Sequence, residues 1–186
     1  MEVSMSQRRY ERTRLPSRVT VIVLLVLGAV SGCGEQKALS FNADAQPSGP
    51  RLWLQHADTH DTRLTFEVWA AEVGAVLGYS FHVRLDDGVV TAAGEVTPAA
   101  ALGSSSEAAL YLQSARADDL AVGGVRRDLG ETALDGPVLL ATFPLDVTGE
   151  VPTPLRVERV VFRRAGGAFV ATSAAGGTIV RKGGES

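Results

Sequence analysis

The sequence has a single cysteine, Cys33, among its 186 residues. A lone cysteine excludes an intramolecular disulfide, and it excludes metal sites built from several thiolates. The chain must therefore be held together by its hydrophobic core alone. The roughly 150 residues that follow Cys33 are enough to bury such a core.

Positive charge is also scarce, because only two lysines occur, Lys37 and Lys182. Residues 1–32 hold five of the 18 basic side chains and two of the 21 acidic ones, which leaves 13 basic against 19 acidic side chains in the remainder. Nucleic acids and anionic lipid surfaces attract proteins through clustered positive charge. A remainder with a net charge near −6 is therefore not predicted to bind either of them.

The common motifs of catalysis and cofactor binding are absent: CxxC, HExxH, GxSxG, GxxxxGK[ST] and GxGxxG do not occur. No catalytic residue and no cofactor are predicted, and an enzyme is the least favoured class of function.

Long apolar runs are absent apart from Val19–Val30, which is twelve residues long and is interrupted only by Thr20 and Gly28. A helix that crosses a bilayer needs about 20 residues, so this run is short for a permanent span. Five arginines precede it. A basic segment followed by a short apolar run and small residues is typical of a secretory signal.

The run ends in Val30, Ser31, Gly32 and Cys33, a pattern that resembles the lipobox of bacterial lipoproteins. The resemblance implies cleavage after Gly32 and a covalent diacylglycerol on Cys33, with further acylation giving a lasting membrane anchor. Gly34 follows the cysteine, which by the same resemblance favours the outer membrane of a Gram-negative bacterium. An ordinary signal peptide, or an uncleaved anchor, with an incidental cysteine is the alternative.

The chain after the predicted signal peptide divides into three parts. Residues 33–50 are small and polar and end in Pro and Gly, so we expect a flexible tether there. Residues 51–182 form the predicted domain, and 183–186 a short tail.

From Arg51 onward apolar residues recur at every second position, which indicates strands with one buried face. In three segments the predicted inward sets are Leu64, Phe66 and Val68; Leu77, Tyr79, Phe81, Val83 and Leu85; and Leu139, Ala141, Phe143, Leu145 and Val147. In 155–164 the alternation slips at Val160–Phe162, as a β-bulge would produce.

Turn signals separate these runs, among them Asp86–Gly88, Gly123–Gly124 and Asp135–Pro137. The segment 97–115 is ambiguous, because its alanines could support a short helix while Ala109–Gln113 suits a strand. Many short strands with frequent turns predict an all-β protein with a jelly-roll or immunoglobulin-like β-sandwich.

Three segments carry a resemblance to cohesin-like domains: GAVLGYSFHVRLDDGVV (74–90), GPVLLATFPLDV (136–147), and the strands and Gly-containing turn that follow, up to GGTIVRKG. Asp87 stands where that family commonly has proline, and 97–135 aligns poorly. The resemblance implies a sandwich of about nine strands that binds a protein partner, in the classical members a dockerin, through one sheet face. Contact residues vary within the family, so none is transferred.

Three polar stretches could hold a metal. QHADTHDT supplies His56, Asp58, His60 and Asp61, which are zinc ligands in type and to which His82 could be added. The acids of RLDDG (84–88) and RADD (116–119) suit Ca²⁺ in type. Calcium takes six to eight oxygens, and neither acidic stretch offers more than two side-chain ligands. We therefore expect turns in all three places and predict no metal site.

Trp69 falls on the polar side of its predicted strand, so it is a candidate ligand contact, for instance as a platform for a sugar ring. Packing beneath a loop or on a second sheet is the alternative for this side chain. The arginines of 156–164 suggest a solvated strand edge that resists pairing with other chains.

Taken together, these patterns predict a membrane-anchored, non-catalytic binding module at the cell envelope, with a dockerin-like protein partner. A carbohydrate-binding lipoprotein that contacts a polysaccharide, and a structural envelope lipoprotein, are the alternatives.

Overall fold

The computed structural model describes residues 38–103 and 108–182. The predicted signal peptide (1–32), the lipobox residues Val30, Ser31 and Gly32, Cys33, and the tail 183–186 lie outside the described residues. Within the described residues no helix has the length and apolar character needed to cross a membrane.

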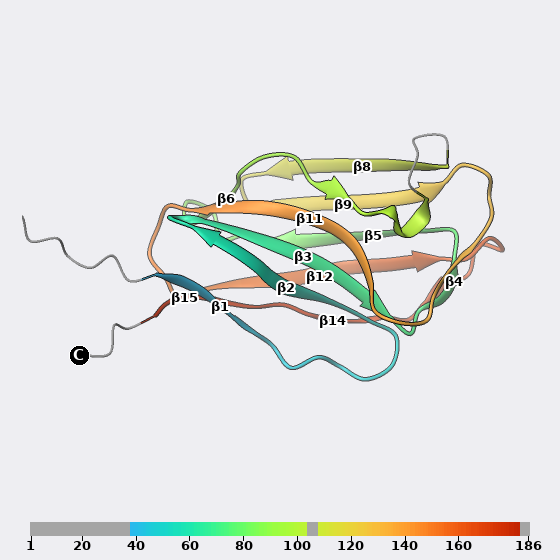
Figure 1. Cartoon of the computed structure of the whole chain (residues 1–186), viewed down its shortest axis with the longest axis horizontal. Coiled ribbons are helices and arrows are strands. Elements are labelled where there is room, and N and C mark those ends of the chain that lie inside the picture. Colours follow the sequence, from blue (N-terminus) through green and yellow to red (C-terminus); the bar gives the residue numbers. More distant parts are fainter. Residues whose placement is uncertain (1–37, 104–107, 183–186) are drawn as a thin grey trace, which may run out of the picture. The chain divides into compact units, whose positions relative to one another are not determined.

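Two mostly antiparallel sheets face each other (Figure 1). The first sheet has the order β1 (Leu39–Ala43), β15 (Gly177–Arg181), β12 (Thr153–Arg163), β5 (Gly78–Arg84), β9 (Asp119–Arg126), β8 (Ala109–Arg116), and β13 (Phe169–Val170) also pairs with β12. The second sheet has the order β14 (Ser173–Ala175), β2 (Arg51–His60), β3 (Arg63–Ala71), β11 (Val138–Val147), β6 (Val90–Ala92), and β7 (Thr97–Pro98) also pairs with β11. β14 and β2 run parallel.

A short ladder of β4 (Gly74–Val76) and β10 (Thr132–Leu134), and one 3₁₀ turn, η1 (Ala100–Leu102), complete the elements. Of the fifteen strands in the described residues, six have two or three residues and nine have five or more. The all-β sandwich is confirmed. The predicted number of about nine strands matches the longer strands only, because the six short ones were not predicted. The ambiguous segment 97–115 contains both expected features, since η1 is helical and β8 is a strand.

The core fills the space between the two sheets with the inward side chains of alternate residues. Phe66 of β3 stacks on Phe143 of β11, with ring centroids 5.9 Å apart, and both side chains are at most 1% exposed. Phe81 and Val83 line the opposite sheet and are fully buried. The predicted inward faces of β3 and β5 are therefore confirmed.

Tyr79 ties the two sheets together. Its hydroxyl donates a hydrogen bond of 3.0 Å to the carbonyl oxygen of Leu140, which belongs to the other sheet. Burial raises the pKa of Tyr79, so the neutral hydroxyl remains a donor throughout the physiological range. Leu140 itself corrects one prediction: a register shift between Leu139 and Ala141 turns Leu140 into the core and leaves Leu139 only half-buried.

The expectation of a flexible tether through residue 50 is wrong for Leu39–Ala43. This segment forms β1 and pairs antiparallel with β15 in unbroken register. Leu39 is buried, and the Phe41 ring meets Phe66 edge-on at 4.9 Å. Two apolar residues at alternate positions are enough to add an edge strand when a partner strand is available.

Gly123 and Gly124, expected in a turn, lie inside β9. A side chain on Gly124 would place its Cβ 2.9 Å from the Tyr111 ring, so glycine at this position allows Tyr111 to pack across the strand. The bulge predicted near Val160 is confirmed, since the β12–β5 register shifts between Glu158 and Val161.

Replacing Phe143 by alanine should lower the free energy of unfolding by about 3–5 kcal/mol, because it leaves a cavity in the core. Urea denaturation measures this change. The matched control is Phe169→Ala, since Phe169 is 70% exposed. The control should stay within about 0.5 kcal/mol of the unmodified chain, and equal losses in the two variants would contradict the assignment of faces.

Phe41→Ala should destabilise the domain by about 2 kcal/mol, because the ring loses its contact with Phe66. Asn42→Ala, one residue along in β1 and exposed, should leave the stability unchanged. If both variants unfold as the unmodified chain does, β1 does not contribute to the domain.

Candidate functional site

The candidate site is the solvent-facing side of β8, β9, β5 and β12, which we call the outer face. Residues opposite one another in register form rows across it. From one end of the strands to the other, the four rows are Leu110, Val125, Gly78 and Arg163; Leu112, Gly123, Ser80 and Val161; Ser114, Ala121, His82 and Glu158; Arg116, Asp119, Arg84 and Arg156.

The first two rows are mostly apolar, apart from Ser80 and Arg163, and they contain three exposed large hydrophobic side chains. Among the described residues five large hydrophobic side chains are exposed, and Leu129 is the one that lies outside the outer face and its margin. The other four are Leu110 at 38%, Leu112 at 65%, Val125 at 38% and, on β13 beside the face, Phe169 at 70%. Side chains of this kind are normally scattered singly, and a group on one face marks a contact surface.

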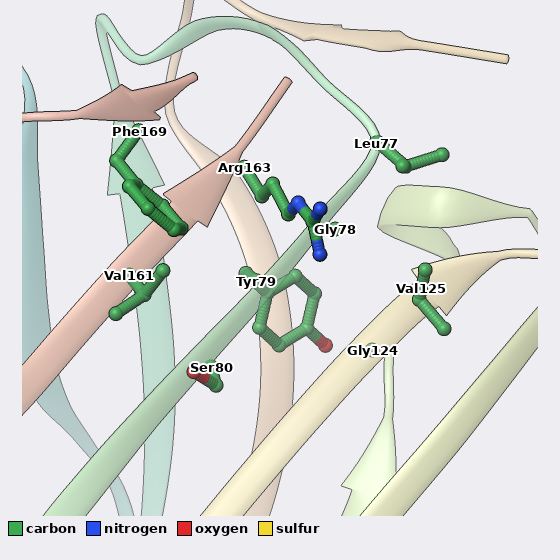
Figure 2. A pocket seen from close by; sticks show the side chains of 9 residues that line it. All are labelled: Leu77, Gly78, Tyr79, Ser80, Gly124, Val125, Val161, Arg163 and Phe169. Atoms are coloured by element: carbon green, nitrogen blue, oxygen red, sulfur yellow. The ribbon is translucent and has the colours of Figure 1, made fainter. Parts of the chain in front are cut away.

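A depression of about 290 Å³ lies in this apolar half. Figure 2 shows Phe169 and Val161 on one side of it and Val125 on the other, with Gly78 and Ser80 between them. The hollow exists because these central positions carry almost no side chain. At Gly78 a Cβ would come within 2.6 Å of the Gly124 carbonyl oxygen, so only glycine fits the observed backbone.

The other two rows are polar and charged. The Nδ1 atom of His82 donates a hydrogen bond of 2.8 Å to the Asp119 carboxylate on the neighbouring strand. Arg84 forms an ion pair of 3.1 Å with Asp118, in the turn between β8 and β9. The outer face thus combines an apolar half with a charged half on the same four strands.

Trp69 lies on the outer side of the other sheet. Its ring stacks on Trp53 with centroids 6.4 Å apart, and its Nε1 donates a hydrogen bond of 2.9 Å to Glu67. Trp53 is itself 7% exposed, and together with Ala71 and Ala175 the two rings form a small cluster. Trp69 is therefore a half-buried side chain that packs on the outer side of its sheet, and its role as a ligand contact stays a prediction.

The structure separates the histidines of QHADTHDT. A bulge between His56 and Asp58 separates the two histidines. His56 lies opposite the buried Phe66, on the inward side of the sheet, and His60 lies opposite Arg63, on the outward side. His56 Nε2 is bonded to Thr59 Oγ1 at 2.7 Å. In the described ranges no three His, Cys, Asp or Glu side chains converge as metal ligands would.

The acidic stretches form turns. The Asp86 carbonyl oxygen accepts hydrogen bonds from the backbone N–H groups of Val89 and Val90, and its carboxylate accepts one from Thr153 at 3.1 Å. Ala117 and Asp118 make the tight turn between β8 and β9.

The arginines of 156–164 begin on a stretch of β12 that pairs with one neighbour only. β5 pairs with Arg156–Arg163, whereas on the other side β15 pairs only with Thr153–Leu155 and β13 only with Phe162 and Arg163. Among the described residues, 156–161 therefore have one unpaired side, as the predicted strand edge requires. Arg156 and Arg163 also project from the outer face.

Comparison with known proteins agrees with this geometry. No protein-family model matches the chain, and no curated protein matches it. Solved structures do match. The second type II cohesin module of the cellulosomal adaptor scaffoldin ScaA of Acetivibrio cellulolyticus superposes with a TM-score of 0.58 at 11% identity, over 74% of this chain and 99% of the module.

The fold is that of the cohesin modules. A non-cellulosomal cohesin from the archaeon Archaeoglobus fulgidus matches with a TM-score of 0.54 at 13% identity, over 70% of this chain and 89% of its own. A type I cohesin–dockerin complex from Clostridium thermocellum contains a chain that matches with a TM-score of 0.52 at 14% identity, over 70% of this chain and 96% of that one. At such identities the likeness concerns the fold.

Proposed function

We propose that this protein is a membrane-anchored, non-catalytic module that binds another protein through the apolar half of its outer face. The observation that carries the proposal is that four of the five exposed large hydrophobic side chains among the described residues, Leu110, Leu112, Val125 and Phe169, lie on or beside one face, where Val125 and Phe169 also line the depression. Protein interfaces draw most of their affinity from a few large side chains that become fully desolvated. A group of exposed apolar side chains on one face is an unfavourable use of surface unless a partner covers it.

The fold supports a protein as the ligand. Several of the solved structures with this fold are complexes of a cohesin with a dockerin. We therefore propose a dockerin-like protein as the partner. A polysaccharide is less well supported, because sugars stack on flat exposed aromatic rings and the outer face and its margin offer only Phe169 among the exposed large side chains.

The anchor is the second part of the proposal. The lipobox-like residues before Cys33 and the basic, then apolar, segment ahead of them support a lipid on the Cys33 thiol. The proposed location is the outer membrane of a Gram-negative bacterium. In this form the protein presents its outer face at the cell envelope.

Capture of a partner tests the binding function. The immobilised chain should retain a defined protein from envelope extract or culture supernatant, with or without Ca²⁺. Leu112→Asp and Phe169→Asp should each weaken that binding about 30-fold, the change expected for hot-spot residues. Leu129→Asp is the matched control, because Leu129 is 70% exposed and lies in the loop after β9.

Equal capture by all of these variants would exclude the outer face as the binding surface. Retention on insoluble polysaccharide that is lost in Trp69→Ala would assign the ligand to the carbohydrate class instead. A chain that captures neither, and whose loss weakens the envelope, would favour a structural role.

Cys33→Ala tests the anchor. The variant should lose all labelling by a radioactive or clickable fatty acid, and unprocessed precursor should accumulate because the signal is no longer cleaved before residue 33. Cys33→Ser should give the same result, since a hydroxyl does not replace the thiol. Normal processing of either variant would contradict the lipoprotein assignment.

A further inference from the structure

A second depression lies on the outer face, at the charged end of β5 and β12. Its volume is about 470 Å³, and its charged lining consists of Arg84, Arg156 and Arg159 together with Asp86 and Glu158. The guanidinium groups of three arginines therefore lie in one depression, although the net charge of the chain is negative.

The backbone places these arginines together in two ways. Arg84 and Arg156 lie directly opposite each other in the register of β5 and β12. Arg159 sits in the bulge between Glu158 and Val161, with a φ of 51°. That left-handed conformation is uncommon for a residue other than glycine, and a bulge of this kind redirects a side chain away from the regular alternation.

Within the described residues, two of the three positive charges have no ion-pair partner. Arg84 pairs with Asp118, and it approaches Asp119 and Glu158 at 4.0 Å. For Arg156 and Arg159 the described part of the chain provides no ion pair within 4.0 Å. Like charges that face each other across a pair of strands destabilise it, so this arrangement does not stabilise the fold.

We propose that this arginine depression binds carboxylate side chains of the protein partner, an inference that rests on the proposed function. A guanidinium group presents two parallel N–H donors that match a carboxylate, and such charge-assisted bonds strengthen when a partner excludes water. Neither Arg156 nor Arg159 has to break an ion pair within the described residues before it binds a carboxylate.

The acidic side chains in the arginine depression narrow the class of ligand that it can bind. Asp86 and Glu158 lie among the arginines, so a dense polyanion such as a phosphate-rich lipid surface would meet repulsion as well as attraction. A protein segment with one or two acidic side chains, spaced by neutral or basic ones, meets the arginines and avoids the acids. The partner class is therefore a protein with an acidic patch.

One partner can reach both halves of the outer face. Arg156 and Arg163 are the ends of the same strand segment, and seven residues of strand span on the order of 20 Å. A standard interface buries about 800 Å² on each partner and is roughly 30 Å across. The apolar depression would then anchor the partner, and the arginine depression would fix its orientation and speed its association.

The first experiment uses the captured partner and the full chain in detergent. Arg156→Glu combined with Arg159→Glu should weaken binding at least about 30-fold at low salt. The affinity of the unmodified chain should fall as salt is raised from 50 to 500 mM, and that of the double variant should change much less. Lys182→Glu, which reverses one positive charge just after β15, is the control for a charge reversal outside the depression and should bind normally.

An unchanged affinity in the double variant would overturn the proposal. In that case Leu112→Asp would still weaken binding if the proposed function is right, so the two failures are distinguishable. Circular dichroism and urea unfolding of the double variant establish that it folds.

A second measurement does not need the natural partner. A peptide with two glutamates separated by three neutral residues, added to the full chain, should shift the arginine Nε–Hε NMR signals of Arg84, Arg156 and Arg159, and the shift of the Arg84 signal should disappear in the double variant. No shift at these signals overturns the proposal. Stronger binding of inorganic phosphate at the same signals, or arginine-dependent binding to vesicles of anionic lipid, would also overturn it and point to a phosphate-bearing ligand.

Discussion

The packing of the two sheets against each other is the constraint on which the rest of this structure depends. With a single cysteine no disulfide can hold the sheets together, so the free energy comes from the side chains between them. Phe66, Phe81, Phe143 and Phe162 are at most 1% exposed, and Tyr79 adds a hydrogen bond from one sheet to the other. Most inward positions of the long strands are therefore committed to the core. The outward positions are free to vary, and the binding surface is built from them.

That division explains how far the sequence predicts the fold. Strict alternation in β3 and β5 reveals the inward side chains because one face of each strand is buried. Alternation does not reveal which strands are neighbours. Leu39 pairs with Arg181 near the other end of the chain, so nothing local distinguishes β1 from a tether. The partners of β12 are equally hidden from the sequence, since β15 and β5 lie on opposite sides of it along the chain.

The candidate site was harder to predict than the core. In ALYLQSAR of β8 the two leucines face outward, whereas Ala109 is buried and the half-buried Tyr111 donates a hydrogen bond to Ala99. Both sides of this strand are apolar, and that is the one signal that could have indicated a second contact surface. Tryptophan attracted attention because exposed tryptophan is uncommon, yet Trp69 is stacked on Trp53 in the other sheet. The arginine depression depends on a bulge and on a cross-strand register, which only the assembled sheet defines.

Strand β1 has a mechanical consequence for the anchored form proposed above. With the fold beginning at Leu39, only the five residues 34–38 separate a lipid on Cys33 from the first sheet, and the six residue steps from Cys33 to Leu39 reach about 20 Å when extended. β1 and β8 occupy opposite edges of that sheet, five strand spacings or roughly 24 Å apart. The tether is thus attached at one edge of the sheet, and the leucines of β8 lie at the opposite edge. A force applied to a bound partner would be transmitted across the sheet to the hydrogen bonds between β1 and β15, which are the last ones before the tether.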